Sequence, residues 1–413
     1  MAFRTLVLAV LFATAATASA DPVPGTSGTN EINPPGMVPP TETISPTIEL
    51  VTMGIGSLIW ERHGHIALCV TRAGMASAMI RPQQDDYCYN YGIGDFHDPM
   101  KMVWGFFRGT HSFWVGKDTP PQMLWVYKKF DRTIWAQKLP LDDAQKQKVI
   151  AKLENDITEE HRYYAYDHFD DNCTTRIRDI IDNVTDHALS KMTDLTDGAS
   201  YRDLARDGFA GMRIPLLATD VALGRSADRV PTYWDRMFLP QYLREAVQTK
   251  WGLKPQILYQ RSECRGSEDP SCIARGIPTV ENPPSGRVIA ALVILVLTAP
   301  VWLTRRLGRF QRIGLAVSIL PYWLLGTIET FLAIISPLPY VHINETCLLW
   351  FPLDIAILFL APETKVKYAK FRVGMIALQA VLMLINVFHQ PLWPEILWPL
   401  IPMATVAFWR KSK

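Results

Sequence analysis

One short segment of the chain combines residue types that could do covalent chemistry. Residues 171–176 read Asp-Asn-Cys-Thr-Thr-Arg, and isoleucines at helical spacing follow them. Asn172 is a favoured residue at helix N-caps, so Cys173 is predicted to lie in the first turn of a helix. Free backbone N–H groups and the helix dipole favour negative charge there. This placement predicts a lowered thiol pKa and a thiolate nucleophile.

A thiolate nucleophile needs a base, and three histidines are candidates. His65 is the first choice because it opens a short apolar segment, residues 65–70, that is predicted to be a strand. His63 would point to the same face if the backbone were extended, but the glycine between the two interrupts that pattern. His168 lies shortly before Cys173 and is a local alternative. For each of them a solvated or structural role is the ordinary alternative.

The group that orients the base is predicted near another strand. Residues 89–92 read Tyr-Asn-Tyr-Gly, which is typical of a strand that enters a glycine turn, and Asp95 follows. Asn90 or Asp95 could accept the imidazole N–H and fix its tautomer, as the third member of a triad does. The alternative is an edge strand closed by a turn, in which Asp95 satisfies backbone groups. Asn172 is a further candidate, for orienting the site or for stabilising an oxyanion.

Other chemistry receives little support from the sequence. Arg176 could hold a phosphate or carboxylate near the cysteine, although an ion pair with Asp179 or Asp182 is the more ordinary role. No Cys-x-x-Cys pair and no His-Glu-x-x-His motif occurs, so neither a metal nor another cofactor is predicted. The net charge of +2 gives no strong signal for nucleic-acid binding.

The N-terminus predicts export. Arg4 precedes an apolar run over 6–13 and the small residues at 18–20, which is the pattern of a cleaved signal peptide over residues 1–20. The apolar run is too short for a comfortable membrane span, and an uncleaved anchor is the alternative.

Cysteine usage agrees with an exported domain. Most of the cysteines precede the apolar C-terminal region, and their number there is odd, so at least one thiol is unpaired. Cys264 and Cys272 lie in a polar loop and predict a disulfide. Cys69 and Cys88 lie in two predicted strands, either as buried thiols or as a second bridge. Cys173 is then the unpaired thiol.

Composition divides the chain into segments. After the signal peptide we predict a flexible tether at 21–46, a globular domain at 47–252, a proline-containing linker at 253–286 and a membrane domain at 287–413. Within the globular domain we predict strands at 48–51, 65–70 and 87–91, a hairpin or strand pair at 123–139, a helix at 142–158, the cysteine helix, and a mostly helical stretch to 247. Strands followed by helices indicate an α+β domain.

The C-terminal region predicts an all-α domain of five membrane spans. They are placed at 288–304, 313–336, 347–361, 373–388 and 392–409. Basic residues gather after the first and third spans and at the C-terminus, whereas the other two loops have none. The positive-inside rule therefore places the C-terminus in the cytoplasm and the globular domain outside. The third span is short and is expected to tilt little or to end in irregular backbone.

These segments together resemble a known family. The strand start Gly64-His65, the segment 89–92 followed by Asp95-Phe96, and the cysteine segment occur in this order. Further matching segments follow at 223–224, 227–228 and 237–240, and another at 344–353. The pattern is similar to the periplasmic domain of the Lnb-type bacterial lipoprotein N-acyltransferases, and the resemblance extends into the membrane tail.

The resemblance implies a circularly permuted papain-like domain of the NlpC type, in which the histidine precedes the cysteine. By position it assigns the nucleophile to Cys173 and the base to His65, and it leaves the third residue open. His63 departs from the family pattern, in which an apolar residue is more usual. The implied reaction moves a fatty acyl group, through a thioester on Cys173, to the α-amine of the lipidated N-terminal cysteine of lipoproteins. The implied partners are diacylated lipoproteins and phospholipids at the periplasmic face of the bacterial inner membrane.

Two other classes of function fit parts of the pattern. A membrane-anchored cysteine hydrolase of cell-wall peptides or lipids would keep Cys173 and His65, but a single anchor would suffice for it. A scaffold or transporter with a sensory periplasmic domain needs no thiolate, and would carry more polar residues within its spans.

Overall fold

The computed structural model describes residues 45–94, 104–105, 108–109, 112–193, 198–280 and 286–409. The predicted signal peptide, nearly all of the predicted tether, and Asp95 lie outside the described residues.

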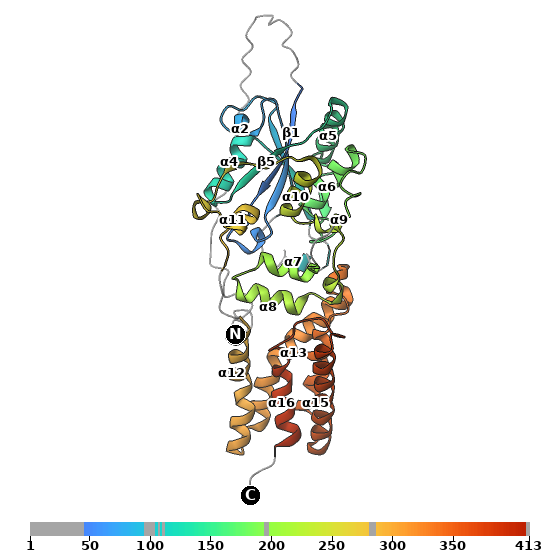
Figure 1. Ribbon diagram of the computed structural model, residues 1–413. Helices are drawn as coiled ribbons and strands as arrows, with labels where there is room; N and C mark the ends of the chain where they lie inside the picture. Colours follow the sequence, from blue (N-terminus) through green and yellow to red (C-terminus); the bar gives the residue numbers. More distant parts are fainter. Residues whose placement is uncertain are drawn as a thin grey trace, which may run out of the picture. The chain divides into compact units, whose positions relative to one another are not determined.

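A seven-stranded antiparallel sheet forms the centre of the globular domain (Figure 1). In spatial order its strands are β6 (Tyr163–Ala165), β4 (Ser112–Asp118), β3 (Tyr87–Ile93), β2 (His65–Thr71), β1 (Thr47–Met53), β5 (Ile134–Lys138) and β7 (Gln256–Tyr259). The strands predicted at 48–51, 65–70 and 87–91 are confirmed as β1, β2 and β3.

Helices cover both faces of this sheet. Successive side chains of a strand point to opposite faces, so they pack alternately into the two apolar clusters. The covering helices are α5 (Asp143–Asp156), α6 (Cys173–Val184) and α10 (Pro240–Trp251) on one face, and α2 (Met75–Ala78) and α4 (Pro120–Lys129) on the other. On β2, Leu68 packs into the cluster beneath α6, and its neighbour Ala67 packs into the cluster beneath α2 and α4. The combination of sheet and helices agrees with the predicted α+β class.

The hairpin predicted over 123–139 is wrong in its first half, which forms α4, whereas the second half forms β5. The start signals of α4 lie before the alternating stretch. Pro120 occupies the first helical turn, and the Gln122 side chain accepts a hydrogen bond from the Thr119 backbone N–H (3.0 Å). These local caps favour the helix over the strand that residue alternation had indicated.

The stretch 253–286 is more than a connection, because β7 pairs with β5 at the edge of the sheet. The predicted disulfide Cys264–Cys272 is present in this stretch. A second disulfide joins Cys69 to Cys88 across β2 and β3, which decides between the two alternatives for that pair. Cys173 is a free thiol, as predicted.

Short helices lie between the sheet and the C-terminal helices (Figure 1). They are α7 (Tyr201–Gly208), α8 (Arg213–Ala222) and η2 (Arg225–Asp228), whereas the next helix, α9 (Tyr233–Arg236), packs against the cluster beneath α6. Their connection to the C-terminal part is by hydrogen bonds. The Gly224 N–H donates to the Tyr340 carbonyl (2.7 Å), and the Gln390 side chain donates to the Leu223 carbonyl (2.7 Å).

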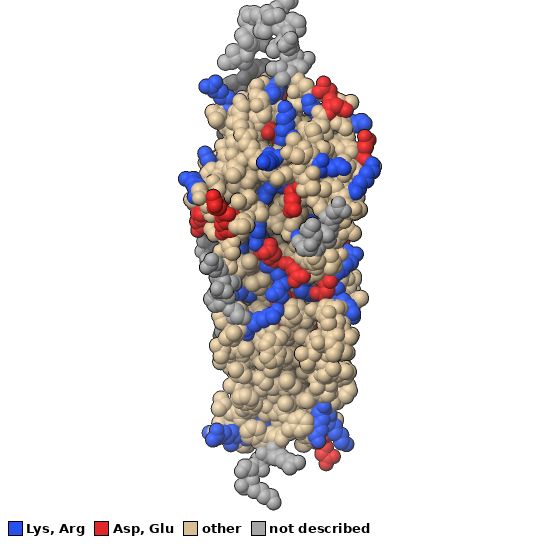
Figure 2. Space-filling view, viewed as in Figure 1, with Lys and Arg blue, Asp and Glu red and all other residues tan. Residues whose placement is uncertain are grey.

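The C-terminal part consists of apolar helices. They are α12 (Gly286–Leu307), α13 (Gln311–Ile335), α14 (Thr346–Leu349), η5 (Pro352–Leu358), α15 (Pro362–Leu384) and α16 (Leu397–Phe408). Figure 2 shows them as a surface with few charges, with charged residues gathered at its two ends. Within the described residues, three helical stretches are long and apolar enough to cross a membrane: Gly286–Leu307, Gln311–Ile335 and Pro339–Leu358. A count of five spans stays a prediction, with α15 and α16 at the places of the fourth and fifth.

The predicted third span, 347–361, overlaps the third of these stretches and has irregular backbone, one of the two outcomes expected from its shortness. The stretch Pro339–Leu358 divides into the 3-10 helix η4 (Pro339–Val341), α14 and the 3-10 helix η5. A buried ion pair supports the break: Arg372 of α15 donates to the carboxylate of Asp354 at 2.7 and 3.1 Å and to the Leu349 carbonyl at 3.0 Å. Asp354 therefore has an ion-pair partner on a neighbouring helix, which accounts for an acidic residue in this apolar region.

Candidate functional site

Cys173 is the first residue of α6, and Asn172 caps that helix. The Asn172 side-chain oxygen accepts hydrogen bonds from the N–H groups two and three residues on (2.7 and 3.0 Å). Its amide donates to the carbonyls of His168 (2.7 Å) and Phe238 (3.0 Å). Asn172 thus fixes the start of the helix and joins it to the segment before α10. Its side chain is engaged in this cap rather than in orienting a histidine.

The thiol is enclosed by its surroundings, with Cys173 only 8% exposed. Gly92 of β3 faces it with a φ of 79°, and a Cβ at that position would lie 3.2 Å from Cys173 Cβ. Burial raises the pKa of the thiol, and hydrogen bonds with Thr174 and Tyr166 oppose this shift only in part. The prediction of a lowered pKa is therefore wrong, because loss of hydration outweighs the effect of the helix start. Cys173 rests as a neutral thiol.

His65 is the first residue of β2 and lies beside a polar pair on the neighbouring strands. Burial and the charge of Arg132 lower its pKa to about 4, and its interaction with the Asn90 side chain opposes this shift. Asn90 is itself buried and donates to the carboxylate of Asp118 (3.0 Å). The β2–β3 register pairs Ala67 with Asn90, so His65 and Asn90 are diagonal neighbours on one face of the sheet. The structure thus brings two of the predicted site residues together.

His65, Asn90 and Asp118 form a polar row across the sheet. Asp118 was not among the residues predicted for the site. It ends β4, which the sequence analysis did not recognise as a strand. The aromatic and β-branched residues at 113–115 were the available signal. Asp95, the other predicted orienting residue, lies outside the described residues.

The two principal groups approach from different faces of the sheet. His65 shares the face covered by α4, where its ring stacks on Tyr127 with centroids 6.2 Å apart. Cys173 belongs to the cluster on the opposite face. Tyr127 lies near both groups, since its ring stacks on His65 and its hydroxyl interacts with the Cys173 sulfur. Burial and the sulfur raise the pKa of this hydroxyl, and the charge of Arg132 opposes the shift. Among the described residues, no hydrogen bond joins the His65 ring to the thiol, and Tyr127 is the side chain that lies near both groups.

The other two histidines lie near the start of α6 or against α7. The His63 ring shares a hydrogen bond with the Ala205 carbonyl (3.1 Å) and packs edge-on against Phe209 (5.0 Å). His168 packs edge-on against Tyr166 (5.3 Å), and Tyr166 in turn hydrogen bonds Cys173. Burial lowers the pKa of His168 to about 4. His168 is therefore the histidine related to the thiol through Tyr166, whereas His63 holds α7 against the sheet domain.

Arg176 pairs with neither of the acids expected for it. Its guanidinium donates to the carboxylate of Asp171 at 2.6 and 2.8 Å and lies over the Tyr164 ring, 3.8 Å from the centroid. The pair joins the residue before the cap to the first turns of α6. This contact joins Arg176 to the segment before the helix, so its ion pair is local rather than directed at the thiol.

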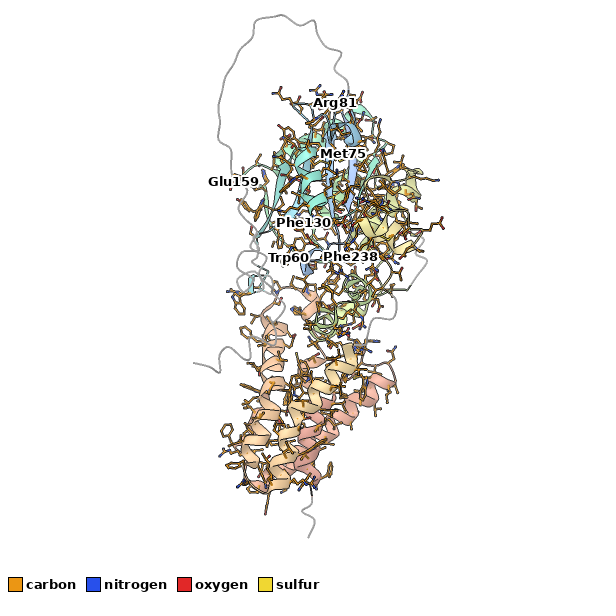
Figure 3. All side chains as sticks on the ribbon, turned by 90° about the vertical axis from the view of Figure 1, so that its left-hand side faces the viewer. Trp60, Met75, Arg81, Phe130, Glu159 and Phe238 are labelled. Atoms are coloured by element: carbon orange, nitrogen blue, oxygen red, sulfur yellow. A yellow bond between two sulfur atoms is a disulfide. The ribbon has the colours of Figure 1, made fainter. Side chains whose placement is uncertain are left out.

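The C-terminal part also touches the nucleophile segment. The Tyr340 ring packs on Phe169 with centroids 4.2 Å apart, and its hydroxyl donates to Asp170 (3.3 Å). Phe238, which accepts from the Asn172 amide, packs on the same Phe169 ring (5.1 Å). Figure 3 shows Phe238 at the end of the sheet domain that faces the apolar helices. The residues leading to Cys173 are thus clamped between the two parts of the chain.

The described residues contain no group of three or more His, Cys, Asp or Glu side chains that could hold a metal ion. The chemistry available at the site is that of a thiol, imidazoles, an amide and backbone N–H groups. A thiol at a capped helix start, near backbone donors, is suited to covalent acyl transfer.

Comparison with known proteins identifies part of the chain as a known domain. Residues 41–206 match the model of a family described as the Lnb N-terminal periplasmic domain. The matched region contains β1 to β6, α6, and each of the histidines and polar residues described above. No curated protein and no solved structure matches the chain.

Proposed function

Residues 41–206 belong to the Lnb N-terminal periplasmic domain family, and from this premise we propose that the chain is a lipoprotein N-acyltransferase. The family indicates a membrane protein that modifies lipoproteins, with its N-terminal domain in the periplasm. The proposed reaction moves a fatty acyl group to the α-amine of the lipidated N-terminal cysteine of a lipoprotein. We further propose a permuted papain-like arrangement, five spans, an inner-membrane location and a cytoplasmic C-terminus.

The observation that carries the proposal is the free, capped thiol. Within the described part of the globular domain, every other cysteine is in a disulfide, whereas Cys173 remains a thiol at the start of α6. A buried structural cysteine would not need a helix start, a capping asparagine and a glycine that makes room for it on the facing strand. These features give the sulfur one position near backbone N–H donors.

The proposed first step forms a thioester. The neutral His65 ring takes the Cys173 proton as the sulfur attacks the ester carbonyl of an acyl donor. Backbone N–H groups at the start of α6 stabilise the oxyanion, and the departing alcohol takes the proton back from His65. This step requires the His65 ring to reach the thiol around the ends of the strands, beside Gly92.

In the second step the lipoprotein amine attacks the thioester carbonyl. The amine proton passes to His65 and then to the departing sulfur, so the thiol is restored and an amide is formed. The enclosed site favours the amine over water. Membrane attachment fits this task, because withdrawing a long acyl chain into water costs about 0.8 kcal/mol per CH₂ group.

The test replaces Cys173 by Ser in the full-length protein, in cells whose lipoproteins otherwise lack the N-acyl group. We expect mass spectrometry of lipoprotein N-terminal peptides to show no N-acylation. The matched control is Cys347→Ser, since Cys347 is the other free thiol among the described residues and lies in α14. Intact-mass analysis of the unaltered protein should show an acyl adduct on Cys173.

The rival functions give different results in the same experiment. N-acylation that persists in the Cys173→Ser protein would refute the proposal. A cysteine hydrolase would lose release of cell-wall peptide or lipid fragments in that variant, with no change in lipoprotein N-termini. A scaffold or transporter would keep its function without the thiol.

A further inference from the structure

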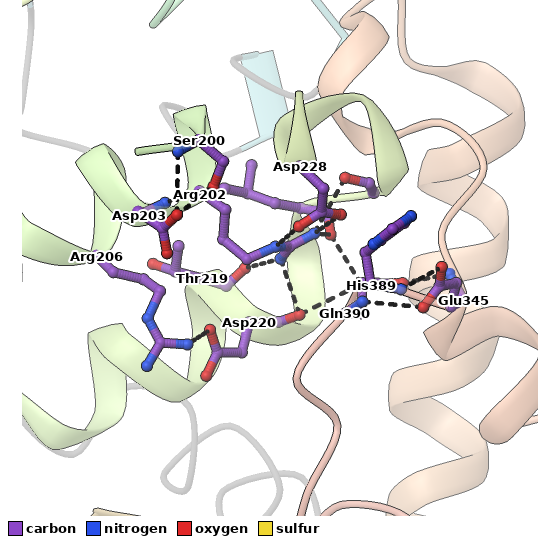
Figure 4. Close-up of polar contacts among 12 residues, drawn as sticks. Ser200, Arg202, Asp203, Arg206, Thr219, Asp220, Asp228, Glu345, His389 and Gln390 are labelled. Carbon is purple, nitrogen blue, oxygen red and sulfur yellow. Dashed lines mark hydrogen bonds and ion pairs between the residues drawn. The ribbon is translucent and has the colours of Figure 1, made fainter. Parts of the chain in front are cut away.

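A polar cavity lies where α7 meets the C-terminal part. It has a volume of about 310 Å³ and is lined by Ser200, Arg202, Asp203, Arg206, Asp228 and His389. The network of polar contacts around it connects α7, α8 and the 389–390 segment (Figure 4). The cavity therefore lies at the level at which the apolar helices end, and charged side chains line it.

One charged side chain at this cavity, Arg202, already has an ion-pair partner. Arg202 is 3% exposed, donates to both carboxylate oxygens of Asp228 (2.7 and 3.0 Å), and also contacts the carbonyls that end α8. Its role is to hold η2 and the end of α8 together. A ligand would have to use the other charges.

Two other charged side chains at the cavity, Asp203 and Arg206, could contact a ligand. Asp203 accepts only from the backbone and hydroxyl of Ser200 (3.0 and 2.7 Å), so no cation among the described residues neutralises it. Arg206 pairs with Asp220, but the second oxygen of Asp220 also pairs with Arg287 (3.4 Å). Two arginines thus share one carboxylate. Asp203 thus faces the cavity as an exposed carboxylate, and the Arg206–Asp220–Arg287 cluster has a further buried carboxylate, Glu395, near Arg287.

An apolar groove begins at the same ion pair. It has a volume of about 330 Å³ and is lined by Arg287, Val288, Ala291, Leu292, Trp393 and Pro394. Ala291 and Leu292 lie one helical turn beyond Arg287 and Val288 on α12, so the groove follows the surface of a candidate membrane span. Arg287 lines this groove and is joined through Asp220 to Arg206 in the polar cavity.

We propose that the polar cavity and the apolar groove together bind one zwitterionic membrane phospholipid. Its phosphate would approach Arg206 and Arg287 from the side away from Asp220, its ammonium group would face Asp203, and an acyl chain would follow α12 past Ala291. A soluble anion would use the arginines but not the groove. A purely apolar ligand would make no use of the charged side chains that line the cavity. An amphiphile that carries both charges uses both halves of the site.

This inference goes beyond the proposed function, because binding needs no chemistry at Cys173. It also gives α7 a second role. Asp203 and Arg206 lie on the side of α7 that faces the cavity, whereas the Ala205 carbonyl of the same helix contacts His63. A bound lipid would therefore hold α7 from one side while His63 holds it from the other.

The test measures lipid binding on the full-length Cys173→Ser protein, so that its outcome is independent of acyl transfer. The protein is placed in nanodiscs of phosphatidylethanolamine and phosphatidylglycerol that contain a trace of phosphatidylethanolamine with a photoreactive acyl chain. Peptide mass spectrometry then locates the label. We expect it in the peptides that contain residues 287–292 and 393–394.

Substitutions separate the two halves of the site. Arg206→Gln should reduce labelling by about tenfold, since it removes one charged hydrogen-bond partner of the phosphate. Ala291→Trp should block the groove and reduce labelling similarly. Asp203→Asn should remove the preference for phosphatidylethanolamine over phosphatidylglycerol in competition. The control is Arg306→Gln, at the other end of α12.

Label spread evenly over the apolar helices would overturn the proposal, and so would equal labelling of Arg206→Gln and Arg306→Gln. Displacement of the label by inorganic phosphate or glycerophosphoethanolamine as readily as by lipid would reassign the cavity to soluble anions, and would overturn it too. Equal melting temperatures of the variants exclude misfolding as the cause of lost labelling.

Discussion

The two faces of the sheet hold the two halves of the candidate site, and they are built differently. On the α6 face, Cys173 is fixed by a helix cap and enclosed by Tyr166 and Gly92. On the α4 face, His65 begins a polar row that continues through Asn90 to Asp118. One face supplies position through packing, and the other supplies orientation through hydrogen bonds.

The burial of both groups determines how a proton would move between them. Burial raises the pKa of Cys173 and lowers the pKa of His65 to about 4, so both groups are neutral at rest. A resident thiolate–imidazolium pair is not expected. Proton transfer then accompanies attack on the ester, and the two charges stabilise each other once they have formed.

The largest expected effect on activity comes from replacing His65, the first residue of the polar row. Replacing His65 by Gln should lower kcat by about 10²–10⁴-fold, because it removes the general base. The comparison is His168→Gln, which alters the histidine related to the thiol through Tyr166. We expect that variant to keep most of its activity. A large loss in His168→Gln with little change in His65→Gln would place the base on the same face as the thiol.

The sequence predicted the packed half of the site better than the polar half. The asparagine cap and the unpaired cysteine were both predicted, because capping and cysteine parity depend on residues that are near in sequence or on simple counts. The pKa of Cys173 was predicted in the wrong direction, since it depends on burial, to which β3, a strand distant in the chain, contributes. Asp118 was missed because its strand was not recognised.

The same distinction between local and distant contacts explains which predictions of the fold were wrong. β1, β2 and β3 are apolar segments that their own residues identify. The segment 123–139 has an alternating pattern that the caps of α4 override. The partner of Arg176 could not be chosen from spacing, because Asp171 lies before the helix and is brought back to Arg176 by the turn at the cap.

The next effect concerns stability and follows from the lowered pKa of His65. The folded protein takes up this proton only near pH 4, whereas the unfolded chain takes it up near pH 6.5. The unfolded state therefore binds more protons between these values, and stability is lost as pH falls from about 6.5 to about 4. The loss is at most about 3 kcal/mol for this residue. Melting temperatures of His65→Gln should fall less over this range than those of the unaltered protein. Parallel curves would show that the histidine is solvated.

A smaller effect is expected from the packed face. Gly92→Ala places a Cβ against Cys173 in a backbone of positive φ, and the left-handed conformation alone costs an alanine roughly 1–2 kcal/mol. We expect a lower melting temperature together with slower alkylation of Cys173 by iodoacetamide. Gly266→Ala is the matched control, because Gly266 also has a positive φ (71°) and nothing lies within 4 Å of its added Cβ. If Gly92→Ala lowers the melting temperature but leaves the alkylation rate of Cys173 unchanged, Gly92 does not control access to the thiol.

The smallest effect probes the orientation that Asn90 gives to His65. Asn90→Ala should lower kcat by about tenfold with little change in KM, since the polar side chain next to the base is lost. Because the Asn90 interaction raises the pKa of His65, its removal should also move the acidic limb of the kcat/KM profile to lower pH. Asn90→Asp should move that limb in the opposite direction, since a carboxylate stabilises the imidazolium. A merely structural asparagine would lower activity at every pH without moving the limb, and that result would leave the polar row without a part in catalysis.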